Sequence, residues 1–215
     1  MELNPSYAQG RAWYGLWYLH WACGRSDEAH DVLTRLVEMD PMSGYAHVIL
    51  GFYNMTCGHA AEAVESCRRG VALDPNSYLA QWTLSGALAG DGKYEEAAAA
   101  GERALDMSGR HGWALAMQAT VYADWGKMDR ARELYAELRA RAERGYVQPA
   151  MASFAAAHVV DVDEGLALVR RAVEERDPII LTLVRIWPPM AIMHADPRFF
   201  EIVAPLKLPN WPSRT

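Results

Sequence analysis

Cysteine and long apolar runs are both scarce in this 215-residue sequence. Its 3 cysteines are an odd number, which favours a reducing compartment over a disulfide scaffold, so we expect a cytoplasmic protein. No apolar run approaches the length of a membrane span. The first residues, "MELNPSYAQG", lack the basic and apolar blocks of a signal peptide. These absences argue against secreted, disulfide-stabilised and membrane-spanning proteins.

An excess of basic residues is also missing. The formal net charge is -6, whereas a nucleic-acid surface normally needs a basic stripe, so we expect no nucleic-acid partner. Hydrophobic residues make up 51% of the chain. That content is enough for a packed core and argues against disorder.

What the sequence does contain is a repeat with a period of 34 residues. A glycine recurs at that spacing, and an alanine follows each glycine by five residues. The glycines are Gly24, Gly58, Gly92 and Gly126, and the alanines are Ala29, Ala63, Ala97 and Ala131. A third column holds Leu16, Leu50, Leu84 and, in the fourth copy, Gln118. These columns define four repeats, at about 10–43, 44–77, 78–111 and 112–145.

Each copy has the pattern of two helices. In the second copy, "GYAHVILGFYNMTC" is apolar at helical spacing and stops at Gly58, and "AAEAVESCRRGVALD" stops before Pro75. Glycine suits the left-handed turn after a helix, and proline cannot continue one. The alanine column marks the place where the two helices approach closely. A single copy could not bury its own apolar faces, so the copies are expected to stack.

Together with "WYGLW" at Trp13–Trp17, "VILG" at Val48–Gly51 and "LDP" at Leu73–Pro75, these columns resemble the tetratricopeptide repeat family. The resemblance implies an all-α fold, an α-α superhelix of about five helix pairs plus C-terminal capping helices.

Two residues depart from the family pattern. Trp17 stands where the family favours glycine, and Gly101 stands where it favours a large aromatic. A glycine inside a helix costs about 1 kcal/mol relative to alanine. We expect Trp82 and Trp113 to fill the space beside Gly101.

The repeat pattern weakens from residue 146. Residues 146–179 are expected to form a degenerate fifth helix pair, with Val160 in place of the turn glycine and Asp161 supplying cap chemistry. Residues 180–215 are expected to hold capping helices and a tail. An apolar helix there should end at Pro188-Pro189, and a last short helix should have Asp196 as N-cap and Pro197 at its first position.

This C-terminal part has a second resemblance. "GYVQPAMASFAA", "AVEERDP" and "DPRFFEIVAPLKLP" resemble the closing segment of bacterial multidomain signalling proteins. In those proteins the repeats follow an adenylate cyclase, a serine/threonine kinase or a winged-helix regulator. Met1–Pro5 likewise resembles the end of an upstream helix. The alternative hypothesis is therefore a regulatory or structural domain of a longer protein, with a groove that binds no free ligand.

The family resemblance also implies a concave wall lined by the first helix of each pair. We expect this wall to bind a partner through Tyr14, Tyr18, Trp21, Tyr45, Val48, Phe52, Met55, Trp82 and Phe154. Tyr14, Tyr18 and Trp21 are four and then three residues apart, so they are expected to share one helical stripe. Family members that hold acidic chaperone tails use a clamp of Lys, Asn and Arg, which is missing here. A second interpretation is that these aromatics are core and that the protein's own tail fills the groove.

No set of residues predicts catalysis. Cys23 and Cys57 share one column, but a tetrahedral metal site needs four ligands with tight local spacing, so we interpret both as packing residues. The 7 histidines make no zinc spacing, and no phosphate-loop or nucleophile-elbow motif occurs. The sequence therefore predicts a non-enzymatic scaffold, without metal or cofactor, that binds a peptide, a helix or a neighbouring domain. It leaves the oligomeric state open.

Overall fold

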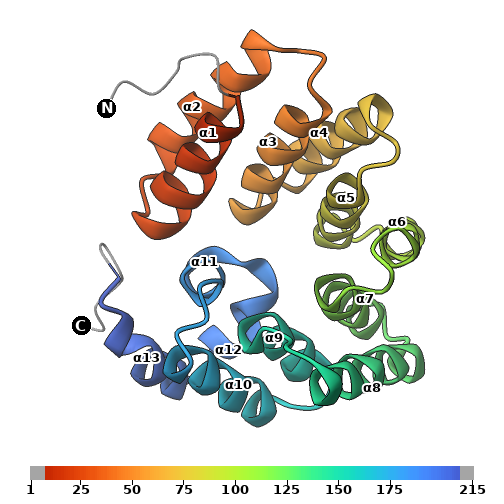
Figure 1. Cartoon of the computed structure of the whole chain (residues 1–215), viewed down its shortest axis with the longest axis vertical. Coiled ribbons are helices and arrows are strands. Elements are labelled where there is room, and N and C mark those ends of the chain that lie inside the picture. The colour runs from red at the N-terminus through yellow and green to blue at the C-terminus, as the bar shows by residue number, and fades with distance from the viewer. Residues whose placement is uncertain (1–7, 209–215) are drawn as a thin grey trace.

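The computed structural model describes residues 8–208, and the side chains of all of these except residues 182, 185 and 186. These residues form helices joined by short connections, and no β-strand occurs among them. The expected all-α superhelix is confirmed: in Figure 1 the chain curves into an open ring. The resemblance drawn for Met1–Pro5 and the last residues of the expected tail lie outside the described part.

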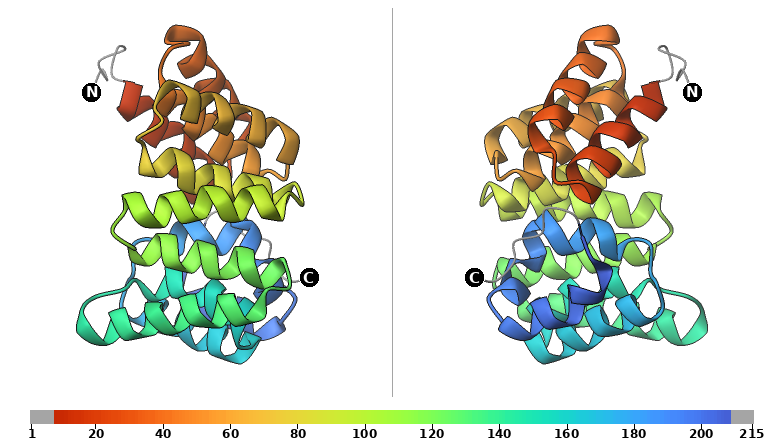
Figure 2. Two further views of the ribbon diagram at one scale, coloured as in Figure 1. Left: turned by 90° about the vertical axis from the view of Figure 1, so that its right-hand side faces the viewer. Right: turned by 90° about the vertical axis from the view of Figure 1, so that its left-hand side faces the viewer.

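Helix pairs follow one another from the N-terminus. The first consists of α1 (Ala8–Ala12) and η1 (Trp13–Ala22) with α2 (Ser26–Met39). The others are α3 (Gly44–Thr56) with α4 (Ala60–Leu73), α5 (Tyr78–Gly90) with α6 (Tyr94–Met107), α7 (Gly112–Asp124) with α8 (Met128–Arg144), and α9 (Pro149–Val159) with α10 (Val162–Glu174). Figure 2 shows how α5 to α8 stack in successive layers.

The repeated glycines and alanines have the roles that the sequence predicts. Each glycine follows a first helix with a positive φ, which is 67°, 79°, 74° and 77° for Gly24, Gly58, Gly92 and Gly126. Only glycine adopts this conformation without strain. The four alanines of the second column are fully buried. The expected N-caps are also confirmed, since Asp161 accepts from the Glu164 amide and Asp196 from the Arg198 amide.

The space at Gly101 is filled differently from what the sequence suggests. Gln118, not Trp82 or Trp113, reaches across from α7 and occupies the volume that a side chain at Gly101 would need. The Gln118 side chain is completely buried, and its Nε2 donates to the Ala98 carbonyl at 2.8 Å. The polar residue in the leucine column therefore pairs with the glycine that departs from the family pattern.

This pairing predicts that the effect of Gly101→Ala on the free energy of unfolding changes sign when Gln118 is removed. Gly101→Ala is expected to lower the free energy of unfolding by about 1–3 kcal/mol, because the new methyl group displaces the buried Gln118 amide. In a Gln118→Ala background the same change should raise it by up to about 1 kcal/mol, since alanine has the better helix propensity. Urea unfolding of the four variants of this cycle measures both effects. A loss of the same size in both backgrounds would contradict the pairing.

The C-terminal segment turns back into the ring. It consists of α11 (Ile180–Ile186), η2 (Pro188–Met190) and α12 (Ala191–His194), and we call residues 180–194 the strap. The chain then continues through α13 (Pro197–Val203) and η3 (Ala204–Leu206). As expected, the apolar helix α11 ends just before Pro188.

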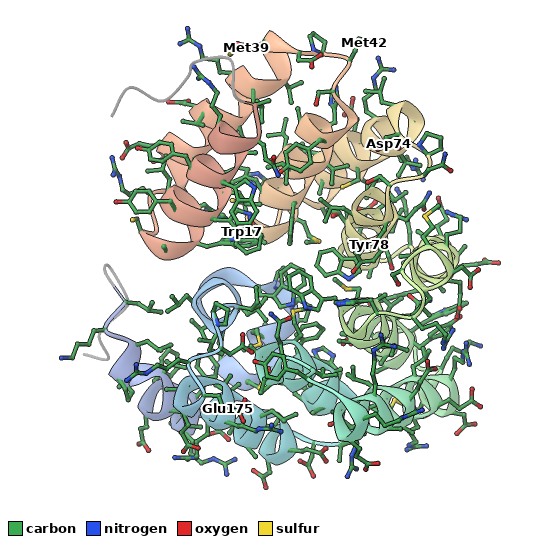
Figure 3. The ribbon with its side chains drawn as sticks, in the orientation of Figure 1. Trp17, Met39, Met42, Asp74, Tyr78 and Glu175 are labelled. Carbon is green, nitrogen blue, oxygen red and sulfur yellow. The ribbon has the colours of Figure 1, made fainter. Side chains whose placement is uncertain are left out.

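The strap lies on the concave side of the superhelix. Its helix α11 packs against η1 of the first pair and against α9 and α10 of the last, so it connects the two ends of the ring. Figure 2 shows η1 above the C-terminal helices on the open side. In Figure 3, Trp17 lies on the side of η1 that faces α11, whereas Met39, Met42 and Asp74 lie at the outer rim. Within the described chain no helix is both long and apolar enough to cross a bilayer.

Candidate functional site

The concave face holds a cluster of aromatic rings, and the strap contributes its centre. We call Trp21, Phe52, Trp82, Phe154 and Trp187 the aromatic cluster. Trp187 stacks on Trp82 with ring centroids 5.7 Å apart and an angle of 8° between the planes. It meets Phe52 at 5.4 Å and Phe154 at 6.0 Å. Trp21 meets Phe52 edge-on at 5.0 Å. Because the repeats stack in register, rings from α3, α5 and α9 surround this one side chain from the strap, and Trp21 of η1 packs behind Phe52.

The nine expected wall residues differ in burial. Six of them are buried: Trp21, Val48, Phe52, Met55, Trp82 and Phe154. Val48 lies against Gly70 of α4 and not in the aromatic cluster. Tyr45 is partly buried, whereas the side chains of Tyr14 and Tyr18 are 40% and 52% exposed. Three of the buried residues, Phe52, Trp82 and Phe154, contact the protein's own strap.

The expected common stripe of Tyr14, Tyr18 and Trp21 does not form. Residues 13–22 are wound as a π-helix, whose hydrogen bonds span five residues. Residues four apart then lie above one another, so Tyr14 stacks on Tyr18 at 5.6 Å and Trp17 meets Trp21 at 4.4 Å. Trp21 thus points to the buried side, while the two tyrosines stay at the surface with Trp13.

Trp187 is not among the residues that the sequence pattern identified. The segment "WPPMAIMHADPRF" is rich in apolar residues, and it begins with this tryptophan. Trp187 is 1% exposed. Its Nε1 has no hydrogen-bond partner among the described residues, which is an unfavourable state for a buried donor.

A cavity of about 240 Å³ lies beside Trp187 on the concave face. Met55, Gly86 and Met117 line its apolar part, and Asp124, His158 and Pro189 line its polar end. Gly90 also borders it. Gly90, Asp124 and His158 occupy the same column of successive repeats, 34 residues apart. The missing side chain at Gly90 thus leaves space next to the two polar residues.

The polar end of the cavity is a hydrogen-bonded chain of three groups. His158 Nδ1 lies 2.7 Å from Asp124 Oδ1, and His158 Nε2 lies 2.9 Å from the Pro189 carbonyl oxygen. Burial alone would lower the pKa of the His158 imidazole. The hydrogen bond to Asp124, the charge of that carboxylate and the Pro189 carbonyl together outweigh this effect and raise the pKa above its ordinary value.

The cysteines lie apart from this site. Cys23 and Cys57 are half-buried before their turn glycines, and Cys67 is buried in α4 beside Gly51. Burial raises the pKa of the Cys57 and Cys67 thiols, which disfavours the reactive thiolate. Cys57 Sγ lies 3.9 Å from His20 Nε2, while His20 also contacts Ser26 and Thr56. Across the described residues, no group of three or more His, Cys, Asp or Glu is placed to hold a metal ion.

Comparisons with known proteins agree with this fold. The sequence profile of the tetratricopeptide repeat matches residues 7–78 and 55–111. A thermophilic TPR protein of Thermus thermophilus is similar in structure, with a TM-score of 0.63 and 19% identity over 92% of this chain and 99% of that one. Pseudomonas aeruginosa pilF has a TM-score of 0.55 and 20% identity over 87% of this chain and 95% of its own.

An O-GlcNAc transferase mutant of Thermobaculum terrenum has a TM-score of 0.54 and 20% identity over 67% of this chain. The present chain spans only 28% of that enzyme. No curated protein matches the sequence. At these identities the solved structures establish the fold alone.

Proposed function

We propose that this tetratricopeptide-repeat protein is a non-enzymatic interaction scaffold whose concave face accepts a segment of a protein partner where the strap now lies. The observation that carries the proposal is the position of Trp187. Its ring is delivered by a short, proline-containing segment into rings from three separate repeats. A wall that accommodates one aromatic side chain from its own chain has the shape and the apolar character to accommodate another.

The strap is an occupant that a partner can displace. Its tryptophan leaves Nε1 without a partner among the described residues, and an unsatisfied buried donor costs about 1–3 kcal/mol. A partner aromatic that lacks this donor would enter the same place without that penalty. Against this, an attached strap has an effective concentration in the millimolar range. The resting protein is therefore expected to bind a free segment only weakly.

A peptide in trans tests the proposal. The probe is a fluorescent peptide with the sequence of residues 183–194, "LVRIWPPMAIMH". Trp187→Ala in the full chain removes the anchor of the competing strap, so this variant is expected to bind the peptide at least about tenfold more tightly than the wild type. Fluorescence anisotropy measures both affinities, and far-UV circular dichroism checks that the variant keeps its helices.

Two controls make this result specific. The Trp13→Ala chain loses a tryptophan that is 52% exposed, and it should bind the peptide as weakly as the wild type. A peptide with alanine in place of its tryptophan should not bind the Trp187→Ala chain. If the intact peptide also fails to bind the folded Trp187→Ala chain, the concave face does not accept a segment in trans.

The same structure provides an argument for a second candidate function. The strap packs against both η1 and α9. It therefore connects the two ends of the superhelix and covers the concave wall between them. A closed wall of this kind suits a C-terminal regulatory or structural domain of a longer bacterial signalling protein that binds no free ligand. Absence of peptide binding to the Trp187→Ala chain would favour this alternative.

A further inference from the structure

At its centre the strap accepts a hydrogen bond from His158 of the superhelix wall. His158 belongs to α9, Asp124 is the last residue of α7, and Pro189 lies in η2 of the strap. The imidazole stands between the other two, with Nδ1 2.7 Å from the carboxylate and Nε2 2.9 Å from the carbonyl oxygen. The His158 side chain is only 14% exposed. Water therefore has limited access to the imidazole, whereas the Asp124 side chain is 37% exposed.

Both neighbours of the imidazole can only accept hydrogen bonds. A carboxylate and a backbone carbonyl have no proton to give, and a neutral imidazole has one N–H to donate. In the neutral form, one ring nitrogen would therefore present its lone pair to an oxygen at hydrogen-bond distance. The imidazolium form donates to both oxygens at once. The observed geometry is thus complete only when His158 carries the second proton.

The backbone of the strap around this contact is otherwise satisfied. The Trp187 amide donates to the Leu183 carbonyl at 3.4 Å, and the Met190 amide donates to the Trp187 carbonyl at 2.9 Å. Pro188 and Pro189 have no amide proton, and their rings fix φ, so the segment loses little conformational freedom when it binds. Met190 is fully buried and receives the Ser153 hydroxyl at its sulfur. The Pro189 carbonyl is then left for His158.

We infer that the concave face recognises a segment of the pattern aromatic–Pro–Pro–apolar, and that a protonated His158, held by Asp124, binds the carbonyl two residues after the aromatic. For the strap the inference stands on the contacts above; for a partner segment it rests on the proposed function. The aromatic fills the cluster of Phe52, Trp82 and Phe154, and the apolar residue takes the place of Met190. Seating of either segment is consequently linked to proton uptake.

The direction of this linkage follows from the contacts. Asp124 and His158 both belong to the repeats, so we expect their contact to persist when the strap is released, whereas the Pro189 carbonyl is an acceptor only in the seated state. Of the residues that line the cavity, Asp124 and His158 are the ionisable ones. The strap itself contains His194, and burial lowers the pKa of its imidazole. In the seated state the Pro189 carbonyl accepts only from a protonated Nε2 and Asp124 only from a protonated Nδ1, whereas in the released state water can donate to or accept from Nε2. In our proposal the missing second donor of a neutral seated ring outweighs the burial that the strap adds. The extra stability of the seated strap is therefore present at low pH and is lost as pH rises through the pKa of seated His158.

Hydrogen exchange of the full-length chain tests the inference. The strap amides of Trp187 and Met190 report opening, after correction for the intrinsic pH dependence of exchange. We expect their opening constant to increase at least about tenfold between about pH 6.0 and pH 8.5. A tenfold change corresponds to the loss of one hydrogen bond to a charged group. In parallel, an NMR titration assigns the His158 resonance by its absence from a His158→Gln chain.

Asp124→Asn is the matched control. An asparagine amide can donate to Nδ1, so a neutral imidazole keeps its N–H on Nε2 and still binds the Pro189 carbonyl. Strap opening in this variant should be nearly independent of pH, whereas His158→Gln should open more readily than the wild type at the lower pH. Equal pH dependence in wild type and Asp124→Asn, or none in the wild type, would overturn the inference.

These outcomes are separate from those of the peptide experiment. If the 183–194 peptide fails to bind the Trp187→Ala chain, binding of a partner segment is refuted, but the inference that the strap is linked to protonation of His158 still stands. Conversely, peptide binding together with pH-independent exchange retains the scaffold and refutes the role of His158.

Discussion

Replacing Phe52 by serine is expected to lower the free energy of unfolding by about 3–5 kcal/mol, the range for removing a buried phenylalanine ring. Phe52 is 5% exposed and contacts Trp21, Trp82 and Trp187 at ring-centroid distances of 5.0, 5.5 and 5.4 Å. No other ring of the aromatic cluster touches three tryptophans among the described contacts. Its removal leaves a cavity between the first, second and third repeats and beneath the strap, and the serine hydroxyl would face apolar rings there.

Tyr18→Ser is the matched comparison. This ring is 52% exposed and stacks only on Tyr14 among the described aromatic contacts, so the change should alter stability by no more than about 0.5 kcal/mol. Urea unfolding followed by circular dichroism measures both variants. A Phe52→Ser chain as stable as the wild type would mean that the rings are not the core of the structure. In that case the aromatics would be available to bind a partner directly, as the sequence alone suggested.

Trp187→Ala is expected to release the strap and to remove up to about 3–5 kcal/mol of stabilisation. The side chain is 1% exposed and lies at the centre of the aromatic cluster. Loss of Trp187 should have a different consequence from loss of Phe52, because the strap can leave the wall while the repeats stay folded. Each repeat contacts mainly its neighbours, so the remaining superhelix has its own stability.

Two measurements separate release of the strap from loss of the fold. Binding of a hydrophobic dye should increase as Phe52 and Trp82 become accessible, and the far-UV helical signal should fall only slightly. Trp13→Ala, which removes an exposed tryptophan, should change neither. Cooperative unfolding of the whole chain after Trp187→Ala would contradict the description of the strap as a displaceable element.

Much of the fold can be predicted from short-range pattern. Gly24, Gly58, Gly92 and Gly126 predict turns because their positive φ angles require glycine. The alanine column predicts where helices pack, and Asp161 and Asp196 predict helix starts, because capping depends on neighbouring backbone amides. These features involve residues close together in the chain, so the sequence contains the information directly.

The contents of the concave face were decided by tertiary structure. The sequence identified Phe52, Trp82 and Phe154 as residues of one wall, but both an open groove and a filled one were consistent with it. Whether a wall is exposed depends on where a distant segment of the chain returns, as Pro189 does to His158 across 31 positions. The same holds for Gly101, whose space is filled by Gln118 from the next repeat.

The sequence by itself therefore determined the repeat period, the helix pairs and the aromatic character of the wall. Only the tertiary structure decided that Trp187 occupies that wall, that the π-helical winding turns Tyr14 and Tyr18 outward, and that His158 bridges Asp124 and Pro189. The physical reason is that turn conformation, helix capping and helix propensity depend on residues that are neighbours in the chain. Ring stacking and the hydrogen bond between His158 and the Pro189 carbonyl instead depend on distances that exist only after the superhelix has closed on its own C-terminal segment.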